Sequence, residues 1–225
     1  MMGALRKLLS ESKNFMLLAA LLMLFGAWMG YANHEMFMEL IAQVFDQLEE
    51  LLEQTEENDS PAFMAGLIFG NNVRAALMML GLGAIIFIIP AISLFVNGLA
   101  VGFILKVSAI GGISPLALFT YGILPHGILE LPAIIMAGGI GIFLGWRLVR
   151  WIFRMIALAI NPDGRSGEHF REETQPVLKT RLKGLAIFTV GLVIVLFFAA
   201  VIEGYVTPGL LEQQMEQISL SWQKN

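Results

Sequence analysis

Five long stretches of this sequence contain no acidic, lysine or arginine side chain, and they constrain the fold more than any other feature. They are residues 14–33, 75–105, 107–129, 131–146 and 184–202. An α-helix needs about 20 apolar residues to cross the hydrocarbon core of a bilayer. We therefore predict an all-α, polytopic membrane helical bundle with about five spans.

The overall composition supports a membrane protein and narrows its partners. Hydrophobic residues make up 57% of the chain and charged residues 14%, whereas soluble domains carry about 25% charged residues. Cysteine is absent, which excludes disulfides and thiolate metal sites. No basic patch with interleaved aromatic residues occurs, so we expect the lipid bilayer rather than nucleic acid as a partner.

The charges are segregated along the chain, and this segregation predicts the topology. Residues 33–62 contain nine acidic side chains and no lysine or arginine, whereas residues 147–183 contain eight basic side chains against four acidic ones. Cytoplasmic loops near spans are enriched in lysine and arginine. We therefore predict a multi-pass protein of the cell membrane with a cytoplasmic amino terminus, the acidic segment outside and the basic loop inside.

The apolar runs and the charged segments together divide the chain into five parts. The apolar run near the amino terminus is longer than that of a signal peptide, so we expect it to be an uncleaved anchor. The parts are a cytoplasmic amphipathic lead-in (1–13), a first span (14–32), an extracytoplasmic acidic amphipathic helix (33–62), a membrane core (63–204) and an extracytoplasmic amphipathic tail (205–225).

The acidic segment has two different faces when it is drawn as a helix. Leu40, Val44, Leu48 and Leu51 recur at helical spacing and form an apolar face, and the acidic residues lie on the opposite side. This apolar face either packs on neighbouring spans or a second copy of the chain, or it binds an extracytoplasmic partner.

Within the core, the pattern predicts a short amphipathic element and four spans. They cover residues 63–73, 75–96, 98–124, 131–148 and 184–202. The pair Asn97 and Gly98 is a tight-turn signature, so we expect the chain to reverse there. The segment 98–124 carries Lys106 and a Gly-Gly-Ile-Ser-Pro interruption. It is either a broken helix, which we favour, or two halves of a re-entrant hairpin.

His126 and Glu130 lie in apolar sequence between Pro125 and Pro132. The two prolines predict interrupted helices here, so that broken or re-entrant helices extend over residues 98–132. Ionisable side chains at membrane depth are costly and usually mark a functional site. Because the two residues are four apart, a helix would place them on one face.

Three roles are open for the pair of His126 and Glu130. The two could be a structural pair hydrogen-bonded to Asn71, Asn72 or Asn97, a proton relay or polar gate, or two ligands of a metal ion. Zinc sites usually use three or four protein ligands, so two are too few. We favour the structural pair and predict no cofactor and no catalytic residues, since no catalytic motif occurs.

Small residues follow directly after the polar pair. Gly138, Gly139, Gly141 and Gly145 would let another helix approach closely, as small residues do at helix contacts in membranes.

Three blocks occur in the order of a known family: FGNNVRAA at 69–76, FVNGLAVG at 95–102 and HGILELPAIIMAGGIGIFLG at 126–145. Together they resemble the stage II sporulation protein M family over roughly residues 63–204. The residues that match the family pattern are Asn71, Asn72, Asn97, Gly98, His126, Gly127, Glu130, Pro132 and Ala133.

The resemblance implies a non-enzymatic polytopic protein. The family's namesake works with a membrane-anchored peptidoglycan-degrading complex during engulfment of the forespore, and members also occur in organisms that do not sporulate. We therefore expect a scaffold, as a homo-oligomer (a dimer), that recruits extracytoplasmic membrane-anchored proteins of envelope remodelling. The alternative is a channel or transporter subunit of permease type. A metal-dependent hydrolase is the weakest hypothesis, because its ligand set would be too small.

Overall fold

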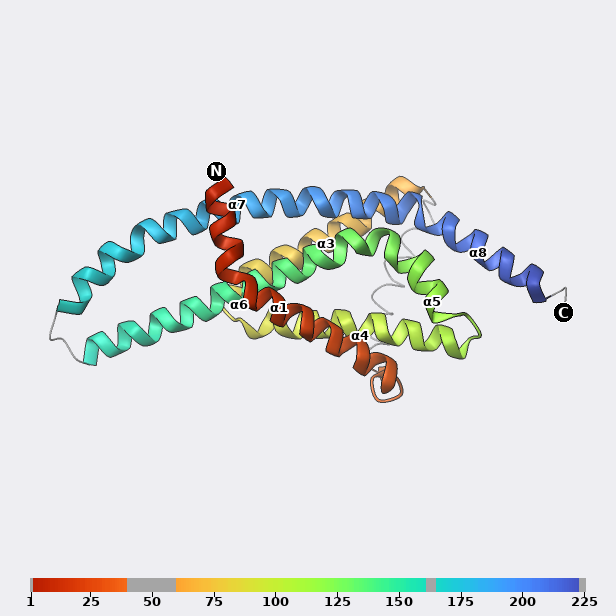
Figure 1. Ribbon diagram of the computed structural model, residues 1–225, viewed down its shortest axis with the longest axis horizontal. Helices are drawn as coiled ribbons and strands as arrows, with labels where there is room; N and C mark the ends of the chain where they lie inside the picture. Colours follow the sequence, from red (N-terminus) through yellow and green to blue (C-terminus); the bar gives the residue numbers. More distant parts are fainter. Residues whose placement is uncertain (1, 40–59, 161–164, 223–225) are drawn as a thin grey trace.

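The computed structural model describes residues 2–39, 60–160 and 165–222, and it is all-helical over these residues (Figure 1). The elements are α1 (Met2–Ala32), α3 (Pro61–Gly83), α4 (Ile88–Ile110), α5 (Pro115–Ala117), the π-helix η1 (Leu118–Ile123), α6 (Leu124–Ile160), α7 (Arg165–Tyr205) and α8 (Thr207–Trp222). Five segments are long and apolar enough to cross a membrane, beginning at residues 2, 61, 88, 115 and 180. The prediction of an all-α bundle with about five spans is confirmed.

Exposed aromatic residues mark the two ends of the bundle. Trp146 and Trp151 are exposed towards the end of α6, and Trp28, Tyr31 and Tyr205 are exposed at the opposite end. Tryptophan and tyrosine are enriched at both membrane–water interfaces. We call the end with Trp146 and Trp151 the basic end, because the arginines of α6 lie there, and the other the polar end.

The closest helix pair is formed by α1 and α4, which run parallel through two interlocking Gly-x-x-x-Gly motifs. A side chain at Gly26 or Gly30 would collide with the backbone of α4. The reverse holds at Gly98 and Gly102, where a side chain would collide with the backbone of α1. Such close approach is the usual basis of helix association in lipid, where no hydrophobic force draws helices together.

The glycines of α6 lie against three different neighbours. Gly138 packs against a leucine of α4, and Gly139 against the backbone of α1. Gly141 and Gly145 lie against the backbone of α3 near Gly83. As a result α6 is in the middle of the bundle, in contact with α1, α3, α4 and α7.

An apolar core joins α1, α3, α6 and α7. Its buried members are Leu8, Ala76, Leu80, Ala133, Ala137, Ile140, Phe143, Phe188, Leu192 and Leu196. Four of these come from the part of α6 that follows Pro132, so the core begins directly after the polar residues at the start of that helix.

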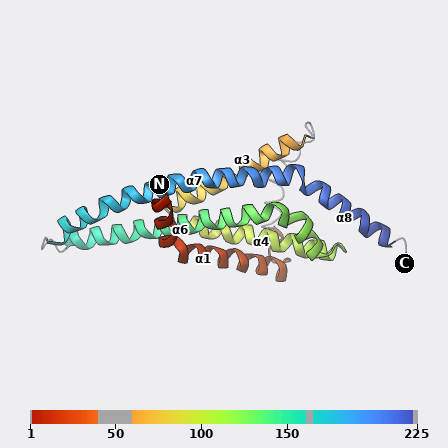
Figure 2. The ribbon, with the colours of Figure 1, turned by 45° about the horizontal axis from the view of Figure 1, so that its top comes forward.

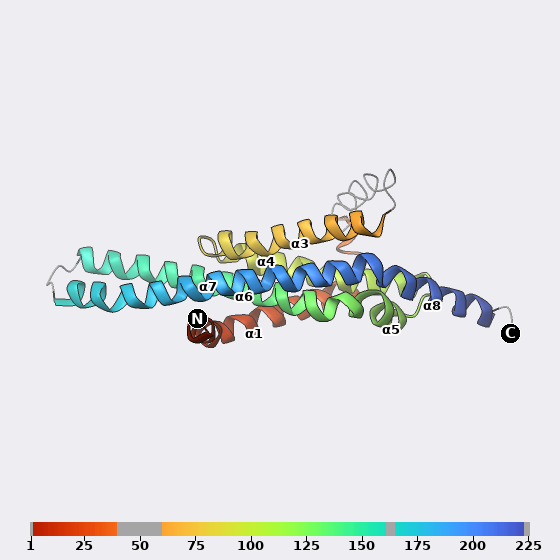
Figure 3. The same ribbon diagram turned by 90° about the horizontal axis from the view of Figure 1, so that it is seen from above.

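The helices α6 and α7 extend side by side beyond the other helices at the basic end (Figures 2 and 3). With 37 residues and a rise of 1.5 Å per residue, α6 is roughly 56 Å long, whereas the hydrocarbon core is about 30 Å thick. At the polar end, α8 projects in the other direction. The protein therefore presents helical surface on both sides of its spans.

The predicted turn at Asn97 and Gly98 is wrong, because both residues lie inside α4. The chain reverses instead at residues 84–87 and again at 111–114, so the predicted spans 75–96 and 98–124 have the wrong boundaries. The second reversal falls in the predicted Gly-Gly-Ile-Ser-Pro interruption, where Gly112 has a φ of 83°. Ser114 then accepts a hydrogen bond from the Ala117 amide and caps the next helix.

The predicted helix break between Pro125 and Pro132 is also wrong. Both prolines lie in α6, which is continuous, and Pro132 is inside it. Proline is tolerated in membrane helices when neighbouring groups satisfy the backbone groups that it leaves free. Within 98–132 the irregular backbone is the turn at 111–114 and the π-helix η1, which precede His126. The predicted partner face of Leu40, Val44, Leu48 and Leu51 lies outside the described residues.

We expect the replacement Gly98→Val to destabilise the bundle by about 1–3 kcal/mol, because the added side chain would separate α4 from α1. The matched control is Gly191→Val, since nothing lies within 4 Å of a side chain at Gly191 of α7. Thermal unfolding in detergent should therefore show a lower midpoint for the first variant alone. Equal midpoints would mean that the α1–α4 contact does not hold the bundle together.

Candidate functional site

Three ionisable side chains meet inside the polar end of the bundle. His126 and Glu130 lie on successive turns at the start of α6, and Glu203 lies near the end of α7. One ligand atom from each of the three residues lies within 4.8 Å of the other two. All three are partly buried, so the cluster faces the inside of the protein.

A third helix completes the cluster. The side chain of Asn72 on α3 lies within hydrogen-bonding reach of the carboxyl group of Glu130, and Asn72 is itself buried. Because α3 runs parallel to α6 and is held close to it near Gly83, Asn72 lies level with the first turns of α6. Among the described residues, every buried polar side-chain atom has a hydrogen-bond partner.

The start of α8 covers the cluster. Thr207 is buried, its hydroxyl lies 3.4 Å from Nδ1 of His126, and it also donates to the carbonyl oxygen of Ile202 at 3.4 Å. One turn further along α8, Leu211 lies beside Gly122 of η1. Single π-helical turns are often found at functional sites, and here one precedes the helix that carries His126.

The two carboxyl groups determine what this cluster can do chemically. Glu203 has an unfavourable Coulomb interaction with Glu130, and two carboxylates at membrane depth are costly unless their charge is compensated. A shared proton would remove one of the charges. A divalent cation held by His126, Glu130 and Glu203 would compensate both, since imidazole and carboxylate groups are ordinary ligands of such ions.

The other predicted polar residues lie away from the cluster. Asn71 is exposed on α3, and Asn97 is exposed on α4 with its amide bonded to the carbonyl oxygen of Ser93 at 2.8 Å. The ammonium group of Lys106 lies 5.5 Å from the ring centroid of Tyr31, on the α1–α4 pair. Of the three asparagines considered, the structure brings only Asn72 to the pair of His126 and Glu130.

Gly127 and Pro132 lie on a different side of α6 from the cluster. With Phe119 and Leu131 among their neighbours, they line a shallow apolar groove of about 230 Å³. Gly98, as described above, has a packing role between α4 and α1.

A family model for stage II sporulation protein M matches residues 15–208. The chain belongs to this family. The match includes α1 from residue 15 onwards, all the spans that follow it and the first residues of α8, so it extends further than the resemblance seen in the sequence blocks. No curated protein and no solved structure matches the chain at a significant level.

Glu203 and Thr207 are the cluster residues of this SpoIIM-family chain that sequence reasoning missed. The last predicted span ended at residue 202, so Glu203 fell just outside it, at the end of the predicted membrane core. One signal was available in the sequence, because Glu203 is followed directly by a glycine. Gly204 lets the end of α7 pack closely against α3 near Ala65. With Glu203 included, the cluster has three possible metal ligands rather than the two that the sequence argument counted.

We expect Asn72→Leu to lower the free energy of unfolding by about 1–2 kcal/mol, because the variant removes the amide group that can hydrogen-bond Glu130 inside the bundle. Asn71→Leu is the matched control, since it makes the same change at the neighbouring, exposed position. Unfolding titrations in detergent should separate the two variants. Comparable stability would contradict the role of Asn72 as the partner of Glu130.

Proposed function

We propose that this protein is a non-enzymatic integral membrane scaffold of the stage II sporulation protein M type. It recruits or organises extracytoplasmic membrane-anchored proteins of envelope remodelling, including peptidoglycan-degrading ones, and it acts in the cell membrane as a homodimer with a cytoplasmic amino terminus. Family membership and the five candidate spans are the basis of this proposal.

The observation that carries the proposal is the apolar core between the polar cluster and the basic end. It is built from Ala133, Ala137, Ile140 and Phe143 of α6 together with residues of α1, α3 and α7. Among the described residues, the buried polar side chains are those of Ser12, Asn72 and Thr207. The last two belong to the cluster, and Ser12 bonds to a carbonyl group of its own helix at 2.9 Å. These residues form no polar path through the bundle, which favours a scaffold over a channel.

The polar end is also the side on which we place the partners. In the sequence the acidic segment 33–62 comes directly after α1, which ends here, and α8 projects from this end (Figure 2). The apolar face of Leu40, Val44, Leu48 and Leu51 gives an amphipathic helix the pattern that is recognised in a partner's groove.

We expect the fourfold replacement of Leu40, Val44, Leu48 and Leu51 by serine to abolish partner recovery in a crosslinking pull-down, as should deletion of residues 36–58. Both changes should leave membrane insertion intact, because they remove no span. A second, differently tagged copy of the protein in the same cells reports dimer formation in the same experiment.

The matched control changes the acidic face instead of the apolar one, by the replacements Asp46→Asn, Glu49→Gln, Glu53→Gln and Glu56→Gln. This control should retain the partners that wild-type protein recovers. If the serine variant recovers the same envelope proteins as wild type, or if wild type recovers none, the scaffold proposal fails.

A channel or transporter subunit of permease type is the second candidate, and the carboxyl pair of Glu130 and Glu203 favours it. Paired acidic groups near His126 are the kind of site at which membrane proteins bind protons or cations. This cluster lies at the polar end, above the apolar core, so transport would require the core to open.

Flux measurements separate the two candidates. For a scaffold, we expect proton and monovalent-cation flux into vesicles containing the protein to equal the flux into empty vesicles. A flux above this background that falls in Glu130→Gln, with Asn71→Leu as the unaffected control, would support the transporter instead.

A further inference from the structure

The basic end of the bundle contains a cavity of about 810 Å³ between α6 and α7, and Ala84, just after α3, is among the residues that line it. Cavities of roughly 300–1,000 Å³ are the size that holds small molecules. Four arginines line it: Arg147, Arg150 and Arg154 from α6 and Arg181 from α7. The cavity is unrelated to the polar cluster, which lies at the opposite end of α6.

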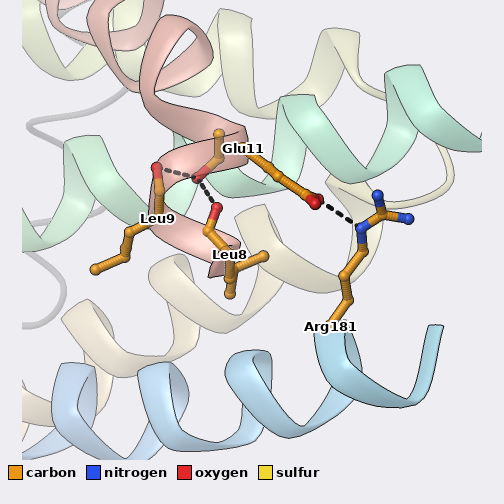
Figure 4. A network of polar contacts seen from close by, with 5 residues as sticks. Leu8, Leu9, Glu11 and Arg181 are labelled. Carbon is orange, nitrogen blue, oxygen red and sulfur yellow. Dashed lines mark hydrogen bonds and ion pairs between the residues drawn. The ribbon is translucent and has the colours of Figure 1, made fainter. Parts of the chain in front are cut away.

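The charge in this cavity is only partly compensated by the described residues around it. Arg181 donates from Nε to the carboxylate of Glu11 at 2.7 Å (Figure 4). Arg147 lies within Coulomb range of Arg181 and Arg150, which repel it, and of Glu11, which attracts it. The carboxylate of Glu11 therefore offsets only part of the positive charge of Arg147, Arg150 and Arg181. The remaining positive charge makes the cavity favourable for an anion.

The Glu11–Arg181 pair is itself held in place by the amino-terminal part of α1. The hydroxyl of Ser12, the next residue, is buried and bonded to the carbonyl oxygen of Leu8 (Figure 4). Leu8 is fully buried in the apolar core, and Gly184 of α7 lets α1 cross closely beside it. The ion pair thus holds the Arg181 side chain in the lining of the cavity rather than leaving it to move in solvent.

The remaining lining is apolar and points to an amphiphile. Leu144 and Leu148 of α6, Leu182 and Leu185 of α7 and the indole of Trp151 form these walls. Trp146 and Trp151 are exposed at this level, as tryptophan is at the boundary between headgroups and acyl chains. A ligand here would place its anionic part against the arginines and its apolar part against the leucines.

We propose that this cavity binds the phosphate headgroup of an anionic phospholipid, with its acyl chains along the leucines of α6 and α7. Arginine recognises phosphate by paired, charge-assisted hydrogen bonds, and basic pockets between spans on the cytoplasmic side bind such headgroups. The sequence predicts the cytoplasmic leaflet for this end of the bundle. The proposal does not depend on the scaffold function, since it concerns the opposite side of the membrane.

The test measures lipid binding to the full-length protein in a neutral detergent by native mass spectrometry. Dioctanoyl phosphatidylglycerol should bind more tightly than dioctanoyl phosphatidylcholine, which has the same chains but a neutral headgroup. In Arg147→Gln/Arg150→Gln, phosphatidylglycerol binding should weaken roughly 30-fold, which corresponds to about 2 kcal/mol for two arginines. Glycerol 3-phosphate, a soluble phosphate, should bind far more weakly than the lipid.

The matched control is Arg6→Gln/Lys7→Gln, which removes the same charge at exposed positions on the same side of the membrane and outside the cavity. It should change phosphatidylglycerol binding less than twofold. Leu182→Trp places a bulkier side chain on the cavity wall without changing its charge and should weaken binding, which keeps the test decisive if the arginine variant does not fold. Equal binding of both lipids, equal effects of the two double variants, or glycerol 3-phosphate binding as tightly as the lipid would each overturn the proposal.

Discussion

Backbone contact between helices at glycine is the constraint on which the rest of this structure depends. Helices in lipid gain nothing from leaving water, so their association relies on close packing and on interhelical hydrogen bonds. In this chain the α1–α4 pair closes at Gly26 and Gly98, and the α3–α6 pair closes near Gly83. The second contact places Asn72 level with Glu130. A further glycine, Gly204, seats the end of α7 and with it Glu203.

The polar cluster follows from these contacts and explains why ionisable residues are tolerated here. His126 and Glu130 alone would leave a carboxyl group in an apolar bundle, at a cost of several kcal/mol. The structure brings polar groups to this pair from three other elements: Asn72 from α3, the hydroxyl of Thr207 from α8 and the carboxyl group of Glu203 from α7. The cluster therefore forms where α3, α6, α7 and α8 come together. Its residues His126 and Glu130 lie on the continuous helix α6 and not at the predicted proline break.

The sequence predicts the class and the number of spans well, because both depend on composition over long windows. The prediction fails where the same residue type has one structural role in soluble proteins and another in a membrane bundle. Asn97 and Gly98 form a turn signature in soluble proteins, but in lipid Gly98 is a packing residue. The reversal at 84–87 contains no polar residue, so nothing in the apolar run marked it. Glu203 was missed because its partners lie far away along the chain, and a single sequence does not show which distant residues meet.

The position of α6 also bears on the choice between a scaffold and a transporter. Alternating access requires one group of helices to rock against another around a fixed site. Here α6 is held on different sides by the backbone of α1 at Gly139 and of α3 at Gly141, and by α4 at Gly138. Any rocking of α6 against one neighbour would break packing with the others. Because packed interfaces do not deform continuously, such a helix is better suited to holding its two ends at a fixed separation than to moving between states. This packing of α6, together with helices that extend beyond the spans at both ends, supports the proposed scaffold over the transporter.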